Sequence, residues 1–303
     1  MTDKRLKIGI VGAGNIGQLL AFQLSNDCDV QLLSHRVTRL SSIDASLTEL
    51  DGIISQRHFP VIPSCHTSIA DLDVILVCVK AYQVIEALEP LLPNLNPHAH
   101  LILMHNGMGP YLSIVPRLKV TQGLSLATTS QGAFRKSQWH VTHSGNGLTQ
   151  IGHIDGTPLT ISAQKHILKN IPNCEWKEDI LTALWHKLAV NAVINPLTSL
   201  HQCRNGDIGL PKFDLVVKEV IVELIQVAKA EGVLLDLTEV TQRVYDVIKL
   251  TANNRSSMLQ DVEAGRQTEI EFINGFIEKQ AKKHEIACPK NQELRQAILE
   301  LNQ

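Results

Sequence analysis

The chain has 303 residues, 44% of them hydrophobic, and a formal net charge of −2. The length favours more than one domain, and the composition is typical of an ordered globular protein. The near-neutral charge argues against a nucleic-acid-binding protein, which concentrates Lys and Arg on a strongly basic face. No apolar run reaches the ~20 residues that span a bilayer, and the six cysteines show no zinc or redox spacing. We therefore expect a cytoplasmic protein with no metal, no membrane and no nucleic-acid partner.

The first part of the chain alternates strand-like and helical segments, the pattern of a largely parallel sheet covered by helices. We expect strands at 6–11, 30–33, 74–79 and 101–104. The strand at 74–79 lacks polar residues, which is typical of a strand buried on both faces near the middle of a sheet.

From about Glu178 onward, longer helical patterns replace the short strands. The apolar spacing predicts helices at 179–195, 212–231 and 237–254. Pro196 is expected to end the first helix and Gly232 the second.

A glycine-rich turn follows the first predicted strand. It lies between that strand and a helical stretch at 18–24, where a dinucleotide pyrophosphate can meet the free N–H groups of a helix N-terminus. Gly12 permits the tight turn, Gly14 the close approach to phosphate, and Gly17 the close packing of helix on strand. The alternative is a glycine-rich turn without a ligand. The residues expected to bind the cofactor are Gly12, Ala13, Gly14, Asn15, Ile16 and Gly17.

The residues after the second predicted strand indicate which dinucleotide binds. NAD sites usually place Asp or Glu there to bind the ribose hydroxyls, but Ser34, His35 and Arg36 occupy this position. The Arg36 guanidinium can make a paired, charge-assisted contact with a 2′-phosphate. The sequence therefore predicts NADP(H), unless Arg36 is an ordinary surface side chain.

Two polar residues follow buried strands. Lys80 and Asn106 come after the strands at 74–79 and 101–104, at the edge where open α/β sheets bind ligands. Each is otherwise an ordinary strand-end residue. The sequence predicts an α/β fold in which a Rossmann-like NADP-binding domain over 1–177 precedes a mostly α-helical substrate and catalytic domain over 178–303.

The helix at 179–195 carries one polar stripe. Lys187, Asn191 and Asn195 recur every fourth residue on an otherwise apolar segment, which places them on one face of a buried helix. A polar substrate could satisfy these groups, and the alternative is bonding to a neighbouring helix. Reduction of a ketone needs a proton as well as a hydride, and desolvation lowers the pKa of a lysine toward the range of a general acid. We therefore expect Lys187 to donate the proton.

Three further positions are weaker signals. A hydroxyl such as Ser257 can bind a carboxylate, and a buried Glu269 could orient Lys187, although helix caps and solvated faces use the same residue types. Asn205 precedes Gly206 and first indicates a turn.

Six segments together resemble the ketopantoate reductase family, or 2-dehydropantoate 2-reductases, in the order of that family and through nearly the whole chain. They are Gly12 to Gly17, Val79-Lys80-Ala81-Tyr82-Gln83-Val84, His105-Asn106-Gly107-Met108-Gly109, Leu184 to Leu197, Ser256-Ser257-Met258-Leu259-Gln260-Asp261 and Thr268 to Gly275.

The resemblance implies an NADPH-dependent reduction of 2-dehydropantoate to (R)-pantoate, a step of pantothenate and coenzyme A synthesis. Whether the protein is a monomer or a homodimer stays open on the sequence. By the same resemblance, Lys187 is the proton donor and Glu269 a second catalytic residue. The implied substrate contacts are Asn106, Lys187, Asn191, Asn195, Asn205 and Ser257. The implied cofactor positions beyond the glycine-rich turn are Arg36, Lys80, Asn106, Ala133 and Glu269.

Two other functions stay open on the sequence: a reductase of another small keto acid, and a non-catalytic NADP-binding sensor. The polar stripe does not exclude the first, whereas the presence of both Lys187 and Glu269 argues against the second. Residues 59–67 and 138–156 match the family poorly and are expected to be loops. His140 and His143 lie in the second of these and are too few to hold a metal.

Overall fold

The computed structural model describes residues 5–35 and 40–301. The chain divides into two compact units, the first made of Met1–His105 and Pro110–Ile180 and the second of Asn106–Gly109 and Leu181–Gln303. Arg36, the predicted contact of the 2′-phosphate, lies outside the described residues. Within the described part of the chain, no helix is both long and apolar enough to cross a membrane.

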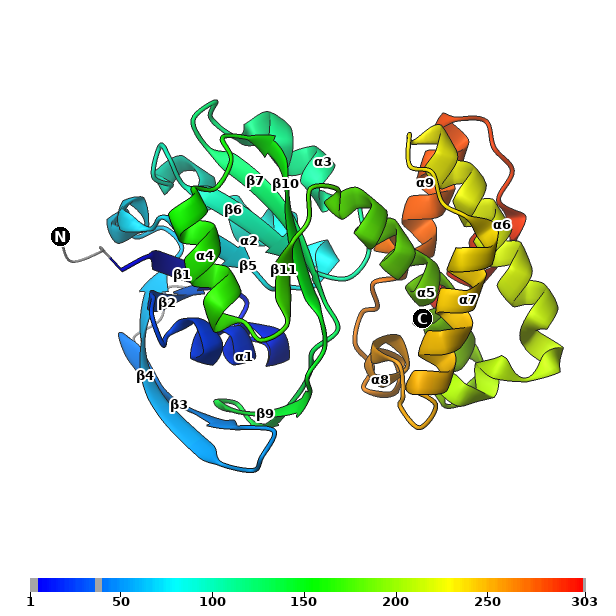
Figure 1. The fold of residues 1–303 in the computed structure, drawn as a ribbon, viewed down its shortest axis with the longest axis horizontal. Helices are drawn as coiled ribbons and strands as arrows, with labels where there is room; N and C mark the ends of the chain where they lie inside the picture. The colour runs from blue at the N-terminus through cyan, green and yellow to red at the C-terminus, as the bar shows by residue number, and fades with distance from the viewer. Residues whose placement is uncertain (1–4, 36–39, 302–303) are drawn as a thin grey trace. The chain divides into compact units, whose positions relative to one another are not determined.

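The first unit is an α/β layer structure built on an 11-stranded sheet (Figure 1). The strands are β1 (Lys7–Val11), β2 (Asp29–Ser34), β3 (Ser42–Thr48), β4 (Ile54–Pro63), β5 (Val74–Val77), β6 (His100–Met104), β7 (Gly123–Thr129), β8 (Gly132–Ser137), β9 (His140–Gly145), β10 (Thr149–Gly156) and β11 (Cys174–Trp176). The helices are α1 (Asn15–Leu24), α2 (Val84–Leu88), α3 (Pro110–Ile114) and α4 (Ile161–Asn170).

The strand order is β11-β10-β7-β6-β5-β1-β2-β4-β3-β9-β8. The run from β7 to β4 is parallel, as in a Rossmann-like sheet, and β10 is antiparallel to β7. The four residues of β5 are all buried, as the apolar run predicts. The prediction of a Rossmann-like α/β region followed by a mostly helical one is confirmed.

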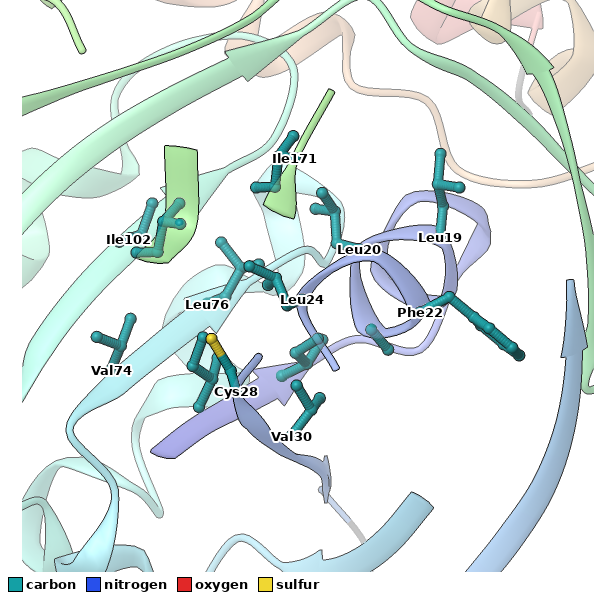
Figure 2. Packing of buried hydrophobic residues seen from close by; sticks show 14 of the residues in the cluster. Leu19, Leu20, Phe22, Leu24, Cys28, Val30, Val74, Leu76, Ile102 and Ile171 are labelled. Carbon is teal, nitrogen blue, oxygen red and sulfur yellow. The ribbon is translucent and has the colours of Figure 1, made fainter. Parts of the chain in front are cut away.

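The core of the first unit surrounds α1. This helix contacts β1 and β2 on one side and β8 and β9 on the other, so the curled sheet encloses it (Figure 1). Figure 2 shows Leu20 and Leu24 on the side of α1 nearest Leu76, while Phe22 points away from them. Phe22 instead meets the ring of Phe59 edge-on, with 5.3 Å between the ring centroids.

The expectation of loops at 59–67 and 138–156 is wrong for most of these residues. The first segment begins within β4, and the second contains β9 and β10. Each strand has a hairpin partner next to it in the sequence and a more distant one, since β4 pairs with β3 and with β2, while β9 pairs with β8 and with β3. The histidines of β9 have structural partners: His140 lies 2.8 Å from the Thr48 hydroxyl, and His143 lies 3.0 Å from the Gly145 carbonyl.

The second unit is helical. Its helices are α5 (Ile180–His201), α6 (Asp214–Ala230), α7 (Leu237–Leu250), α8 (Ser257–Glu263), α9 (Asn274–Lys283) and α10 (Pro289–Leu301). Gly232 has φ +84° just beyond α6, as expected of a helix stop. The helix predicted at 237–254 ends at Leu250, and the carbonyls of Ala252 and Asn254 accept the backbone N–H groups of Gly206 and Asn205 instead.

The expectation that Pro196 ends its helix is also wrong, since α5 continues through it to His201. A proline inside a helix leaves the carbonyl four residues earlier without its usual donor. Here the side-chain amide of Asn274 donates to that carbonyl, on Ala192, over 3.1 Å. A residue distant in sequence therefore satisfies the group that the proline leaves open.

Candidate functional site

The turn between β1 and α1 has the backbone geometry of a phosphate-binding turn. Gly12 has φ +92°, and a Cβ there would lie 2.6 Å from the Val79 side chain. A Cβ on Gly17 would overlap the carbonyl oxygen of Gly12, so the helix can approach the strand only without one. A Cβ on Gly14, in contrast, would meet nothing within 4 Å.

The first turn of α1 offers donors to an anion. Its first intrahelical bond joins the Gln18 N–H to the Gly14 carbonyl, so the preceding amides have no acceptor within the helix. Gly14 is the N-cap and supplies no capping side chain, and the first turn holds no acidic residue. These features fit a dinucleotide pyrophosphate, which would meet uncapped N–H groups and the positive end of the helix dipole.

A cavity of about 410 Å³ adjoins this turn. Gly12 and Ala13 line it after β1, and Ser34 and His35 line it after β2. The volume lies in the range of small-molecule and cofactor pockets, which is roughly 300–1,000 Å³. Glu86 also lines the cavity, with its carboxylate 3.5 Å from His35 Nε2. A larger groove of about 1050 Å³ runs along α7, and none of the predicted site residues lines it.

Two predicted cofactor residues that are distant in sequence come together at α1. The Asn15 side-chain amide donates to the carbonyl of Ala133 on β8 over 3.1 Å. The Gln18 amide donates to the carbonyls of Ala13 and Gln138, at 2.9 Å each. The β8–β9 pair is thereby fastened to the glycine-rich turn. Lys80 is half-buried and follows Val79, whose side chain lies next to Gly12.

The polar stripe of α5 lies on a mostly buried helix in the second unit. Lys187 and Asn191 are half-buried, and Asn195 is only 6% exposed. The residues between them include Ala189, Ala192 and Val193, which are fully buried. The stripe is therefore the polar face of a core helix.

The Lys187 ammonium is subject to two opposing effects. Burial lowers its pKa to about 8, and the nearby Glu269 carboxylate opposes this decrease by favouring the charged form. Glu269 is 4% exposed and precedes the short 3₁₀ turn Ile270–Phe272. The side-chain amide of Asn106 donates to Glu269 Oε2 over 3.3 Å. Two residues from distant parts of the sequence, Asn106 and Lys187, thus act on the one carboxylate of Glu269.

A glycine holds Asn106 in this position. Gly107 has φ +73°, and a Cβ there would overlap the carbonyl oxygen of Phe272. The next residue, Met108, donates its N–H to the same carbonyl over 2.7 Å. Residues 106–109 follow β6 in the chain but belong to the second compact unit. The position of Asn106 after a buried strand was visible in the sequence, whereas the requirement for Gly107 depends on Phe272, which is distant in the sequence.

Asn205 and Ser257 are placed by elements other than α5. The Asn205 amide donates to the Thr251 hydroxyl over 2.9 Å, and its buried Oδ1 has no hydrogen-bond partner among the described residues. Ser257 is exposed at the start of α8. The preceding Ser256 is the buried N-cap, and its hydroxyl lies 2.7 Å from that of Thr198 on α5.

Models of two protein families match consecutive parts of the chain. The family described as "Ketopantoate reductase PanE/ApbA" matches residues 8–156, and "Ketopantoate reductase PanE/ApbA C terminal" matches residues 179–302. The chain belongs to the ketopantoate reductase family.

Members of this oxidoreductase family from two bacteria align with almost the whole chain. The 2-dehydropantoate 2-reductase of Vibrio cholerae is 37% identical over 304 residues, covering 98% of both chains. That of Yersinia pestis is 34% identical, covering 97% of this chain and 94% of the relative.

Solved structures have the same fold. A probable 2-dehydropantoate 2-reductase from Bacillus subtilis superposes with a TM-score of 0.84 at 29% identity, covering 98% of this chain and all of the other. D-mandelate dehydrogenase, in a ternary structure with NADH and anilino(oxo)acetate, reaches a TM-score of 0.87 at 20% identity, covering 98% of each chain. At that identity the second match shows a shared fold.

Proposed function

We propose that this ketopantoate reductase family member catalyses the NADPH-dependent reduction of 2-dehydropantoate to (R)-pantoate, with Lys187 as the general acid. The observation that carries the proposal is the half-buried Lys187 near the buried carboxylate of Glu269. Burial lowers the pKa of this lysine to about 8. The names of the relatives supply the substrate. We further propose that residues 1–177 hold the cofactor and residues 178–303 supply the substrate-binding and proton-donating groups.

The bound cofactor supplies the hydride, and the side chains of the protein supply the rest of the chemistry. Lys187 Nζ holds the proton that the carbonyl oxygen takes up as negative charge develops on it. Glu269 keeps part of the lysine population charged, because its carboxylate favours the ammonium. Asn106 donates to Glu269 Oε2 and so restrains the carboxylate.

The amides near Lys187 bind and orient the substrate in this proposal. Asn191 and Asn195 share its helix face. The buried Oδ1 of Asn205 is an acceptor that lacks a partner in the described structure, and the substrate hydroxyl is a suitable donor for it. Ser257 adds a hydroxyl at the start of α8, where a substrate carboxylate can accept its hydrogen bond.

The glycine-rich turn and its surroundings hold the cofactor in this proposal. Ala13, Asn15 and Ile16 complete the turn, and we propose Lys80, Asn106, Ala133 and Glu269 as further cofactor contacts. Arg36 binds the 2′-phosphate, which accounts for a site without an acid after β2. Because Glu86 lines the cavity, its negative charge should weaken the binding of that phosphate.

The proposed activity is tested by comparing the turnover of 2-dehydropantoate, 2-oxoisovalerate and acetohydroxy acids while NADPH oxidation is followed. We expect 2-dehydropantoate to have the highest kcat/KM. Lys187→Ala should lower kcat by about 10²- to 10⁴-fold while NADPH affinity is retained. Lys279→Ala, at an exposed lysine on α9, is the matched control and should keep full activity. Faster turnover of another keto acid would contradict the substrate assignment.

Cofactor preference is tested by two substitutions that should change NADPH affinity in opposite directions. Arg36→Ala should weaken NADPH binding by roughly 10-fold and leave NADH binding nearly unchanged, because only NADPH carries the 2′-phosphate. Glu86→Gln should tighten NADPH binding slightly, because it removes a negative charge from the cavity. Titration of both cofactors by fluorescence measures these effects, and equal changes for NADPH and NADH would argue against an Arg36–phosphate contact.

A further inference from the structure

The helix that carries the polar stripe, α5, contains a proline next to the last residue of the stripe. Pro196 follows Asn195 directly and has no N–H to donate to the carbonyl of Ala192, which itself follows Asn191. Ala192 is fully buried, so its carbonyl needs a donor from elsewhere in the protein. Two predicted substrate-binding residues therefore flank the turn of α5 that the proline interrupts.

Asn274, the first residue of α9, supplies that donor. Its Nδ2 lies 3.1 Å from the Ala192 carbonyl oxygen and 3.0 Å from Oδ1 of Asn291. Neither asparagine has any solvent exposure. A hydrogen bond to a freed backbone carbonyl in a dry environment is costly to lose, because no water replaces it.

A buried carboxylate fixes which way these amides point. Glu223 on α6 accepts the backbone N–H groups of Lys290 and Asn291, over 2.8 and 2.9 Å, at the start of α10. It also accepts the Asn291 side-chain amide over 2.8 Å. Since a carboxylate only accepts, Asn291 must turn its Nδ2 toward Glu223 and its Oδ1 toward Asn274. Nδ2 of Asn274 therefore points toward Oδ1 of Asn291 and the carbonyl of Ala192, which both accept its hydrogen bonds.

We propose that Asn274 is a positioning residue for the reaction, acting through α5 and not by touching the substrate. A helix bends at a proline, and the bend depends on how the freed carbonyl is satisfied. By holding the Ala192 carbonyl, Asn274 sets the course of α5 between Asn191 and Asn195 and hence the spacing of their amides. The inference rests on the proposed role of these two residues in substrate binding.

The test is a double-mutant cycle between Asn274 and Pro196. Asn274→Leu keeps most of the volume and removes the donor, and we expect kcat/KM for the keto acid to fall by roughly 10-fold, mainly through a higher KM. The KM for NADPH should not change. Pro196→Ala restores a backbone N–H that can bond to the Ala192 carbonyl, so in this background Asn274→Leu should raise the KM by only about 2- to 3-fold. The loss of the bond to Asn291 is common to both backgrounds and cancels in the cycle.

A matched control separates positioning from general destabilisation. The buried amide of Asn170 donates to the carbonyl of His166 in α4, over 2.7 Å. Asn170→Leu removes the same kind of bond in the first unit and should leave the KM for the keto acid unchanged. If Asn274→Leu does not fold, Asn274→Ser retains a hydroxyl and should show a smaller change in the same direction, again reduced by Pro196→Ala.

The outcomes distinguish this inference from the proposed function. The kinetic cycle is measured on whichever keto acid the wild-type enzyme turns over fastest, so a wrong substrate assignment leaves the cycle interpretable. Equal effects of Asn274→Leu with and without Pro196→Ala would overturn the positioning role. So would a loss confined to kcat, or an equal rise in KM in Asn170→Leu.

Discussion

At the scale of single residues, Lys187 has a pKa suited to its proposed work. Loss of water around the ammonium outweighs the attraction of Glu269, so the pKa is about 8, below the ordinary value of 10.5. A lysine with this pKa is mostly protonated at neutral pH and releases its proton more readily than an exposed one. Both properties favour general-acid catalysis.

The pH dependence of the reaction follows from this pKa. The donor is present below the pKa and lost above it, so kcat/KM should be flat below about pH 8 and fall by about tenfold per pH unit above it. Glu269→Gln removes the charge that favours the ammonium, so the break should move to lower pH. Initial rates between pH 6 and 10, at saturating NADPH, measure both profiles. A break that is unmoved in Glu269→Gln would show that the carboxylate does not act on Lys187.

Gly107 is a second residue on which the site depends, and its substitution has a clear expected outcome. Gly107→Ala should destabilise the protein by about 2–4 kcal/mol, because it combines a positive φ with overlap of the Phe272 carbonyl. It should also lower activity, because it displaces Asn106 from Glu269.

Gly265→Ala is the matched control for this change. Gly265 has φ +60° and open space around it, so its substitution should cost only about 1 kcal/mol and keep activity. Denaturant unfolding and steady-state kinetics of the two variants provide the comparison. Equal losses at the two positions would show that contact with Phe272 is unimportant.

At the scale of elements, two glycines of the turn from β1 to α1 have different roles, one in folding and one in binding. Gly17 is required by packing, since a Cβ there would overlap the Gly12 carbonyl, whereas a Cβ on Gly14 would enter open space. The two glycines belong to one motif, but they serve different purposes: Gly17 allows close packing, and Gly14 leaves open space beside the turn.

Alanine substitution should resolve the two roles. Gly17→Ala should lower the free energy of unfolding by about 2–4 kcal/mol, because helix and strand must move apart. Gly14→Ala should leave unfolding within ~1 kcal/mol of wild type and weaken NADPH binding by roughly 10-fold, because the methyl group occupies space near the uncapped amides of α1. Thermal unfolding without ligand and NADPH titration distinguish these effects. Unchanged NADPH affinity in Gly14→Ala would place the pyrophosphate elsewhere.

At the scale of the whole molecule, the chain forms two compact units, with the glycine-rich turn in one and Lys187 in the other. Each unit has its own apolar core, and the proposed cofactor contacts of the turn are made within the first. A ligand that binds only the folded state stabilises it in proportion to its affinity.

NADPH should therefore stabilise the protein without substrate. At a free concentration 100-fold above its Kd, the expected gain in the free energy of unfolding is about 2.7 kcal/mol. Lys187→Ala should show the same gain, and NADH at the same concentration a smaller one. Urea unfolding with each cofactor measures these differences. An equal gain with NADH would contradict the preference for NADPH.

The sequence by itself determined the features that depend on local order. The strands near 6–11, 30–33, 74–79 and 101–104 were predictable, because buried parallel strands are continuous apolar runs. The spacing of Lys187, Asn191 and Asn195 placed them on one helix face, because helical periodicity is a property of the chain alone. The glycine motif was readable because its flanks have strand and helix character.

Only the tertiary structure decided what depends on distant partners. Strands β4, β9 and β10 pair with β2, β3 and β7 respectively, which are not their neighbours in the sequence, so the local pattern does not predict these pairings. Helix α5 continues through Pro196, and Asn274, which is distant in the sequence, satisfies the Ala192 carbonyl that the proline leaves open. The pKa of Lys187 depends on burial and on Glu269, which folding brings near it. Hydrogen bonds and electrostatic effects such as these depend on residues that come close to one another only when the chain folds.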